Sequence, residues 1–152
     1  MKSSVDWRTA PLSRLVAHLT VDHTELRYDV IGGVARSFTT IEGRAIFTAL
    51  VELLRRHLTR EDHVVFPLIE AMERMGLPPH LEGGLTPVVA RLSAEHDLIQ
   101  KTIRELRSIC GDRIAPLEAA ILGCMELENT ILFPRALALE KTLRLTQPVA
   151  GR

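Results

Sequence analysis

A histidine and a glutamate four residues apart occur in the middle of this sequence, at His57 and Glu61. On a helix this spacing projects both side chains from one face, about one turn apart. Cys124 and Glu128 repeat the spacing in the second half of the chain. Imidazole and carboxylate groups together suit iron, manganese or zinc. Such pairs are also common on solvated helix faces, so further ligands at the same level are needed to indicate a metal site.

The register of the helices brings further ligands to that level. Residues equidistant from a tight turn meet in an antiparallel helical hairpin. His23 and Glu61 are equidistant from a predicted break at residue 42. Glu61 and His96 are equidistant from a break near residue 78, and His96 and Glu128 from one at residue 112. We therefore predict that five side chains from four helices converge in one layer: His23, His57, Glu61, His96 and Glu128.

A cluster of carboxylates and imidazoles inside a bundle predicts a bound cation. Each buried charge loses its hydration, and a metal ion compensates for that loss. The predicted cofactor is non-haem iron, as one or two ions, with manganese or zinc as possible substitutes. Five side-chain ligands or fewer leave room on the metal for water, dioxygen, nitric oxide or peroxide.

The elements that must position these residues are helices. Leu, Ala, Glu and Arg recur at spacings of three and four residues, which predicts an all-α fold. The first helix is expected to begin near residue 11 and to end before residues 38–40. The other three are expected at residues 42–74, 86–109 and 116–145. The predicted organisation is a lead-in at residues 1–10, one helical domain at residues 11–146 and a loose tail at residues 147–152.

An internal repeat divides the domain into two similar helical hairpins. LTVDH at residues 19–23 matches LSAEH at residues 92–96, and HLTREDHVVFP at residues 57–67 matches CMELENTILFP at residues 124–134. Two such hairpins predict an antiparallel four-helix bundle with up-down-up-down topology. Because proline removes a helical N–H and crowds the preceding turn, bends are expected after Phe66 and Phe133.

These motifs resemble the hemerythrin-like, HHE cation-binding family, and in particular the metal-binding domain of the repair-of-iron-centres proteins. The resemblance covers nearly the whole chain: VDWRTAPL at residues 5–12, DH at 22–23, EHD at 95–97 and ENTILFPRA at 128–136. It implies a hemerythrin-like fold and two irons that share bridging carboxylates, at positions that correspond here to Glu61 and Glu128. His23 and His96 then resemble the ligands of one iron, and His57 a ligand of the other.

The sequence departs from that family pattern at two positions. Cys124 stands where the family has a histidine on its last helix, and no histidine lies between His23 and His57 to supply the remaining ligand. We therefore expect one tightly held metal, with any second ion weak or dependent on Cys124. Cys124 itself is either a thiolate ligand or a small buried apolar residue. Three histidines are not predicted ligands, because helical geometry or a loop position turns them outward: His18, His63 and His80.

Charge and cysteine content exclude several other classes of protein. Lysine plus arginine equals aspartate plus glutamate at 19 each, so the chain has no basic surface for nucleic acid or an anionic membrane. No apolar run approaches the roughly 20 residues that a membrane span needs. Cys110 and Cys124 have the spacing of neither a disulfide framework nor a zinc knot. We expect a cytoplasmic protein with reduced thiols that is a monomer or a weak homodimer.

Three functions are consistent with such a site. The first is a stress-response iron protein that binds or senses dioxygen, nitric oxide or peroxide, or handles iron under oxidative or nitrosative stress. The second is an enzyme that reduces peroxide or oxygen, with weak peroxidase- or oxidase-like activity at the metal. The third is a bundle that has lost its metal and serves as an interaction module. The register of the five candidate ligands argues against the third.

Overall fold

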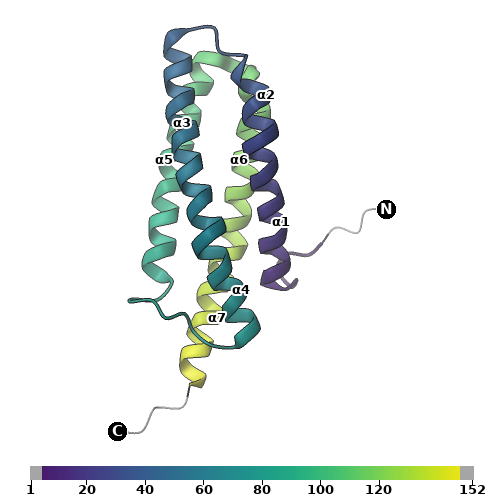
Figure 1. Ribbon diagram of the computed structural model, residues 1–152, viewed down its shortest axis with the longest axis vertical. Helices are drawn as coiled ribbons and strands as arrows, with labels where there is room; N and C mark the ends of the chain where they lie inside the picture. The colour runs from purple at the N-terminus through teal and green to yellow at the C-terminus, as the bar shows by residue number, and fades with distance from the viewer. Residues whose placement is uncertain (1–4, 148–152) are drawn as a thin grey trace.

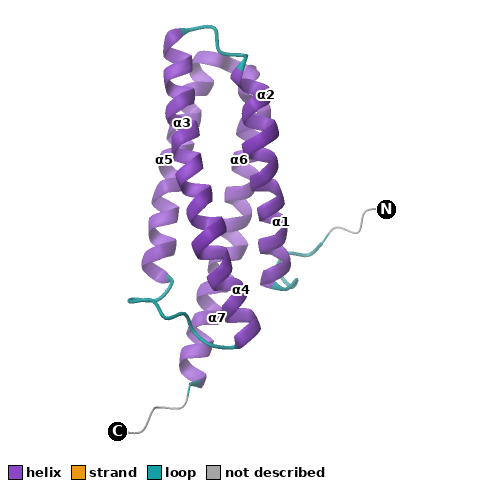
Figure 2. Cartoon of the chain, viewed as in Figure 1, coloured by secondary structure: helices purple, strands orange, loops and turns teal. Residues whose placement is uncertain are grey.

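The computed structural model describes residues 5–147, and every regular element in that range is helical (Figures 1 and 2). Residues 1–4 of the predicted lead-in and residues 148–152 of the predicted tail lie outside the described part. The prediction of an all-α fold is confirmed. The elements, in chain order, are α1 (Leu12–Glu25), η1 (Leu26–Val30), α2 (Ile31–Ala35), α3 (Ile41–Arg60), η2 (Glu61–Val65), α4 (Phe66–Met75), α5 (Thr86–Cys110), η3 (Gly111–Ile114), α6 (Ala115–Leu127), η4 (Glu128–Leu132) and α7 (Phe133–Thr146).

The described helices join into three continuous runs, at residues 12–35, 41–75 and 86–146, where the sequence predicted four separate helices. The predicted break at residue 112 is itself helical, because η3 is a 3₁₀ turn that links α5 directly to α6. Gly111 has φ 60° and ψ −142°, a backbone conformation that favours glycine. At this turn the third run folds back on itself, so that α5 leads up to the turn and α6 runs back down the bundle in the opposite direction (Figure 1).

The apolar core is divided into two parts along the length of the bundle. One cluster includes Leu15, Leu19 and Phe66, and the other includes Leu26, Leu54 and Ile103. On each leg, one candidate ligand falls between residues of the first cluster and residues of the second: His23, Glu61, His96 and Glu128. The polar layer therefore lies between two apolar cores.

Three π-helical turns occur at the level of that layer: η1, η2 and η4. Two of them end directly before the Phe66-Pro67 and Phe133-Pro134 steps. Proline has no N–H to donate and its ring clashes with the carbonyl one turn back, and a wider turn accommodates both effects. The irregularity thus precedes each Phe-Pro step, whereas the sequence predicted a bend after it. No proline accompanies η1.

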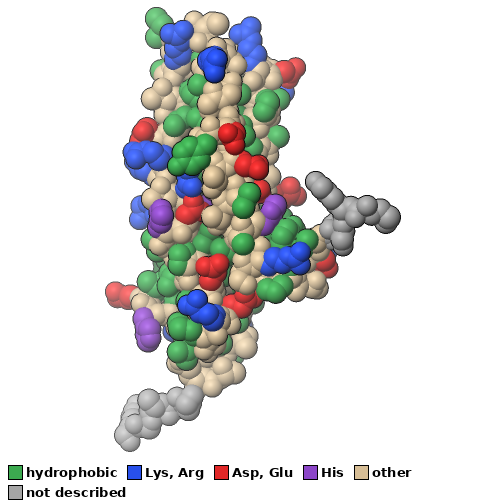
Figure 3. Space-filling view, turned by 45° about the vertical axis from the view of Figure 1, so that its right-hand side comes forward, with side chains coloured by type: hydrophobic (Ala, Val, Ile, Leu, Met, Phe, Trp, Pro, Cys, Tyr) green, Lys and Arg blue, Asp and Glu red, His purple; other side chains and the backbone are tan. Residues whose placement is uncertain are grey.

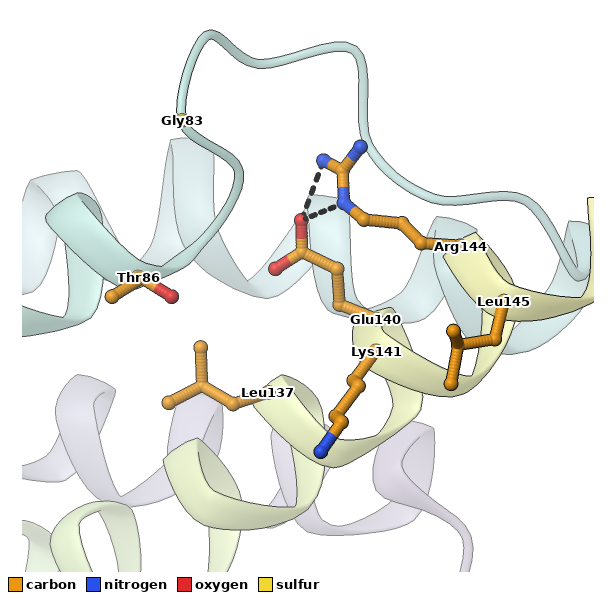
Figure 4. Close-up of a pocket in the computed structure, with 7 residues that line it drawn as sticks. All are labelled: Gly83, Thr86, Leu137, Glu140, Lys141, Arg144 and Leu145. Atoms are coloured by element: carbon orange, nitrogen blue, oxygen red, sulfur yellow. Dashed lines mark hydrogen bonds and ion pairs between the residues drawn. The ribbon is translucent and has the colours of Figure 1, made fainter.

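Two glutamates near the ends of the hairpins cap helix N-termini at equivalent positions of the repeat. The carboxylate of Glu73 accepts hydrogen bonds from the backbone N–H of Leu12 at 2.7 Å and of Ser13 at 2.8 Å. In the second hairpin, Glu140 accepts a hydrogen bond from the backbone N–H of Leu85 at 2.9 Å and is paired with Arg144 (Figure 4). The repeat therefore extends from the ligand motifs to the helix ends.

The surface carries both signs of charge without a dominant field, as the interspersed basic and acidic side chains of one face illustrate (Figure 3). Among the described residues, no helix combines the length and apolar character required to cross a membrane. Cys110 is half-buried and Cys124 is buried, and both thiols are free.

The two caps predict a matched pair of stability losses. Glu73→Ala and Glu140→Ala each leave backbone N–H groups without their carboxylate acceptor, so each should lower the free energy of unfolding by about 1–3 kcal/mol. The loss should be larger for Glu140, because it is 6% exposed and its removal also frees Arg144. Urea unfolding measures the effect, and Glu105→Ala at an exposed position serves as the control. Losses at positions 73 and 140 no greater than the control value would contradict this role.

Candidate metal centre

Five ionisable side chains are buried in the layer between the two apolar cores. Their exposed fractions lie between 0% and 3%, which is rare for charged groups and requires compensation. Four legs of the bundle contribute them, from α1, α3, η2, α5 and η4. The residues are those that the sequence brought to one level: His23, His57, Glu61, His96 and Glu128.

Four of these residues converge most tightly. One ligand atom from each of His57, Glu61, His96 and Glu128 lies within 4.8 Å of the others. The Nε2 atoms of His57 and His96 are 2.9 Å apart, and His96 Nε2 lies 3.2 Å from Glu128 Oε2. His57 Nε2 lies 3.3 Å from Glu61 Oε2. These atoms surround a single position that two imidazoles and two carboxylates face.

His23 approaches the same carboxylates but stands apart from that group of four. Its Nε2 is 3.1 Å from Glu128 Oε1 and 3.7 Å from Glu61 Oε2. The family resemblance implied that His23 and His96 share one metal position and that His57 serves the other. The geometry differs: His57 pairs with His96, and His23 lies with Glu128 away from that pair.

Each of the three histidines is held by a polar residue on its outer side. The Nδ1 of His23 donates to Asp62 at 2.8 Å, that of His57 to Glu95 at 2.9 Å, and that of His96 to Asn129 at 2.9 Å. Such bonds fix the ring orientation and leave Nε2 directed inward. Sequence reasoning missed these three partners. The signal was present, because Asp62 and Asn129 directly follow the two glutamates of the repeat, Glu61 and Glu128.

The outer partners are themselves anchored. Arg27 pairs with Asp62 at 2.6 Å, and Glu95 pairs with Arg60 and with Arg91. Aromatic rings add a second constraint, because Phe66 stacks on His23 and Phe133 stacks on His96 at ring-centroid distances of 5.4 Å and 6.0 Å. His23 and His96 are thus each held both by a partner at Nδ1 and by a stacked phenylalanine ring.

Glu61 is the group that most needs a partner. It is 0% exposed, and neither of its carboxylate oxygens accepts a hydrogen bond. Burial, and next the negative charge of Glu128, raise the pKa of Glu61. A buried carboxylate without a donor is costly. A cation at the position that His57, His96 and Glu128 also face would remove that cost, so the donor set fits a metal ion.

The charges of the cluster perturb the histidines as well. Burial lowers the pKa of His23, but its hydrogen bonds with Asp62 and Glu128 outweigh this effect and raise that pKa to about 9. Burial also lowers the pKa of His57, but the interactions with Glu61 and Glu95 outweigh this effect, so the pKa of His57 is raised. Both imidazoles are therefore inclined to hold a proton in the absence of a metal ion, which compensates part of the carboxylate charge.

Cys124 is buried and lines a small cavity together with His57 and Glu128. Burial, followed by the charge of Glu128, raises the pKa of its thiol to about 12. The remaining histidines lie outside the cluster, as predicted. His18 stacks on Trp7 at 4.8 Å and pairs with Asp22, while two further histidines are exposed: His63 and His80.

Comparison with known proteins agrees with the geometry of the cluster. A family model described as the hemerythrin HHE cation binding domain matches residues 44–136. The chain is similar to the iron-sulfur cluster repair protein YtfE of Salmonella paratyphi B, Salmonella newport and Salmonella heidelberg. In each case the identity is 24% over 162 aligned positions, which cover 88% of this chain and 70% of the relative.

The hydrogen bond from His23 to Asp62 predicts a pH-dependent contribution to stability. The folded-state pKa of about 9 lies above the unfolded value near 6.5, so charged His23 stabilises the metal-free fold fully below pH 6.5. That contribution is lost as the pH rises through 9. Asp62→Asn should lower the pKa of His23, measurable by NMR, and its stability deficit in urea should shrink between pH 6 and pH 9. A deficit independent of pH would reflect loss of the Arg27 contact alone and would contradict the prediction.

Proposed function

Because the chain belongs to the hemerythrin HHE cation-binding family, we propose that it is a non-haem iron protein that binds a small ligand such as dioxygen, nitric oxide or peroxide. The observation that carries the proposal is Glu61, a fully buried carboxylate without a hydrogen bond. Its oxygens face His57 and His96, which outer partners hold with Nε2 inward. A bound cation would account for this arrangement, because it would give both oxygens of Glu61 the partner that the hydrogen bonds of the layer do not supply.

The residues that would hold the metal are the tightly converging four: His57, Glu61, His96 and Glu128. Iron suits this nitrogen and oxygen donor set, with manganese or zinc as substitutes. Bound iron supplies redox chemistry and a place for a small ligand. The second position of the family pattern would retain His23 and the shared carboxylates, with Cys124 where a histidine stood. We therefore propose one tightly held ion per chain.

The biological setting belongs to the same proposal. The similar Salmonella proteins carry the name iron-sulfur cluster repair protein, which supports a role in iron handling under oxidative or nitrosative stress. We propose a hemerythrin-like, up-down-up-down bundle as the scaffold, consistent with the way the third helical run folds back at η3. The free thiols of Cys110 and Cys124 support a reducing, cytoplasmic location.

A second candidate function is reduction of peroxide or oxygen by an enzyme. The observation in its favour is Cys124, a free thiol in the cavity that His57 and Glu128 also line, where a redox-active thiol would be close to the metal. The distinguishing measurement is turnover of peroxide with an added thiol reductant by the iron-loaded protein. Catalytic turnover that is lost in Cys124→Ala favours the enzyme, and saturable binding without turnover favours the carrier or sensor.

Metal analysis tests the proposal directly. Protein expressed with iron should retain about one ion per chain, and chelation should lower its melting temperature, because binding to the folded state adds stability. His57→Ala and His96→Ala should each lose most of the metal. His63→Ala changes an exposed histidine outside the cluster and should retain it. Equal melting temperatures of stripped and iron-loaded samples, with no retained metal, would reject a metal-binding role.

The departure at Cys124 predicts a change in stoichiometry. In the repeat, Cys124 is the counterpart of His57, so Cys124→His should add an imidazole beside His23 and the two carboxylates. Metal content should rise from about one toward two ions per chain. Cys124→Ala is the matched control and should stay near one ion. Two tightly held ions in the unmodified protein, unchanged in Cys124→Ala, would show that other side chains complete the second position.

A further inference from the structure

A surface pocket of about 250 Å³ lies between the α1–η1 segment and α6. Small side chains form much of its α6 wall, at Ala120 and Gly123, and Cys124 lies at its inner end. Leu26, 1% exposed, belongs to the opposite wall. Two acidic residues, Asp22 and Glu25, also line it.

Behind this pocket lies a second, mostly apolar cavity that reaches the candidate metal ligands. Its volume is only about 10 Å³, close to that of a single water molecule, and its walls include Leu54, Ile121 and Met125, together with His57 and Glu128. Leu26 and Cys124 line both spaces. These two side chains are therefore the partition between the surface pocket and the cluster.

The equivalent pocket in the other half of the repeat is closed by charge. It lies between α3 and α5, has a volume of about 210 Å³, and leads to His57. Glu95 crosses it, bound to the Nδ1 of His57 and paired with Arg60 and Arg91. The two pockets occupy equivalent places in the internal repeat. Any difference between them therefore comes from the side chains that line each one.

The pocket beside Cys124 has no equivalent of the contacts that Glu95 makes across the other pocket. Asp22 corresponds to Glu95 in the repeat, and its ion pair is with His18 at 3.4 Å. The position equivalent to Arg60 is Leu127, and the imidazole that Glu95 binds is replaced by the thiol of Cys124. Nothing among the described residues ties Asp22 across this pocket to Cys124.

We propose that this pocket is the route by which a small uncharged ligand reaches the metal cluster, with Leu26 and Cys124 as its gate. The inference rests on the proposed function for its ligand class. Uncharged molecules are selected because the cavity behind the gate is apolar. Anions are disfavoured because Asp22 and Glu25 line the mouth, and none of the described residues that line it is a lysine or an arginine.

Thiol labelling of the metal-free protein tests the route without using the metal. In a Cys110→Ser background, Cys124 is the remaining thiol and can be modified by methanethiosulfonates of equal chemistry and different charge. The neutral methyl reagent should react more than about tenfold faster than the anionic sulfonatoethyl reagent, after normalisation to a free small thiol. Asp22→Asn combined with Glu25→Gln should reduce that ratio.

Variants that block the mouth of the pocket test whether reagents reach Cys124 through it. An added Cβ at Gly123, on the wall of the pocket, meets no atom within 4 Å, so Gly123→Phe is the variant chosen to cover the mouth. It should slow labelling by the neutral reagent more than about tenfold. Arg56→Phe changes the equivalent position of the other pocket and should leave the rate unchanged. Equal rates for neutral and anionic reagents, or a Gly123→Phe variant of unchanged reactivity and melting temperature, would overturn the route.

The outcomes separate this inference from the proposed function. If the protein bound no metal, the proposed function would be rejected. The labelling rates of the metal-free protein would still show whether the pocket is the route to Cys124. In iron-loaded protein, Gly123→Phe should also slow nitric oxide binding in stopped-flow measurements with metal content unchanged. Retained metal together with unhindered nitric oxide binding in that variant would reject the route and leave the metal site intact.

Discussion

Two carboxylates buried side by side set the conditions that the rest of this bundle meets. Glu61 and Glu128 are at most 1% exposed, and each loses its hydration in a layer with apolar core above and below. Three imidazoles reduce the cost, and the outer residues Asp62, Glu95 and Asn129 hold those imidazoles in place. Stacked phenylalanines and arginine pairs then restrict the outer residues and rings. The order of the site follows from the need to compensate charge where water is excluded.

The two hairpins meet this need in similar ways. Both use a glutamate followed by an outer acid or amide, both stack a phenylalanine on the histidine, and both cap a helix with a distant glutamate. The differences beside the cluster are His57 and Arg60 in one half, where the other half has Cys124 and Leu127. The first replacement leaves two imidazoles together on one side of the cluster, and both replacements remove the ion pairs that close one of the two pockets. The cluster is thus asymmetric within a nearly symmetric frame.

Sequence analysis predicted the level of the site better than its internal pairing. Equal distances from the turns fixed the height of the five ligands along the bundle, and the resemblance to the hemerythrin family is confirmed by the family match. The position of a residue along the bundle axis does not determine which residue it faces across the bundle, so the pairing of His57 with His96 was not predicted. The outer partners depend on helix rotation, which the π turns alter. The helical link at η3 was not predicted, because Gly111 indicates a turn but not the hydrogen bonding of that turn.

The π turns also limit how this chain can change in length. A π turn holds one residue more than an α-helical turn, so losing a residue there would restore regular geometry locally. The residues of a π turn sweep about the same angle as an α-helical turn with one residue fewer, so the helix beyond such a deletion would keep its rotation about the axis. For η2 this would leave Phe66 against His23, and for η4 it would leave Phe133 against His96. A deletion in an α-helical part of either leg would instead rotate everything beyond it by roughly 100°. The π turns are therefore the places where these two legs can lose one residue and keep the site in register.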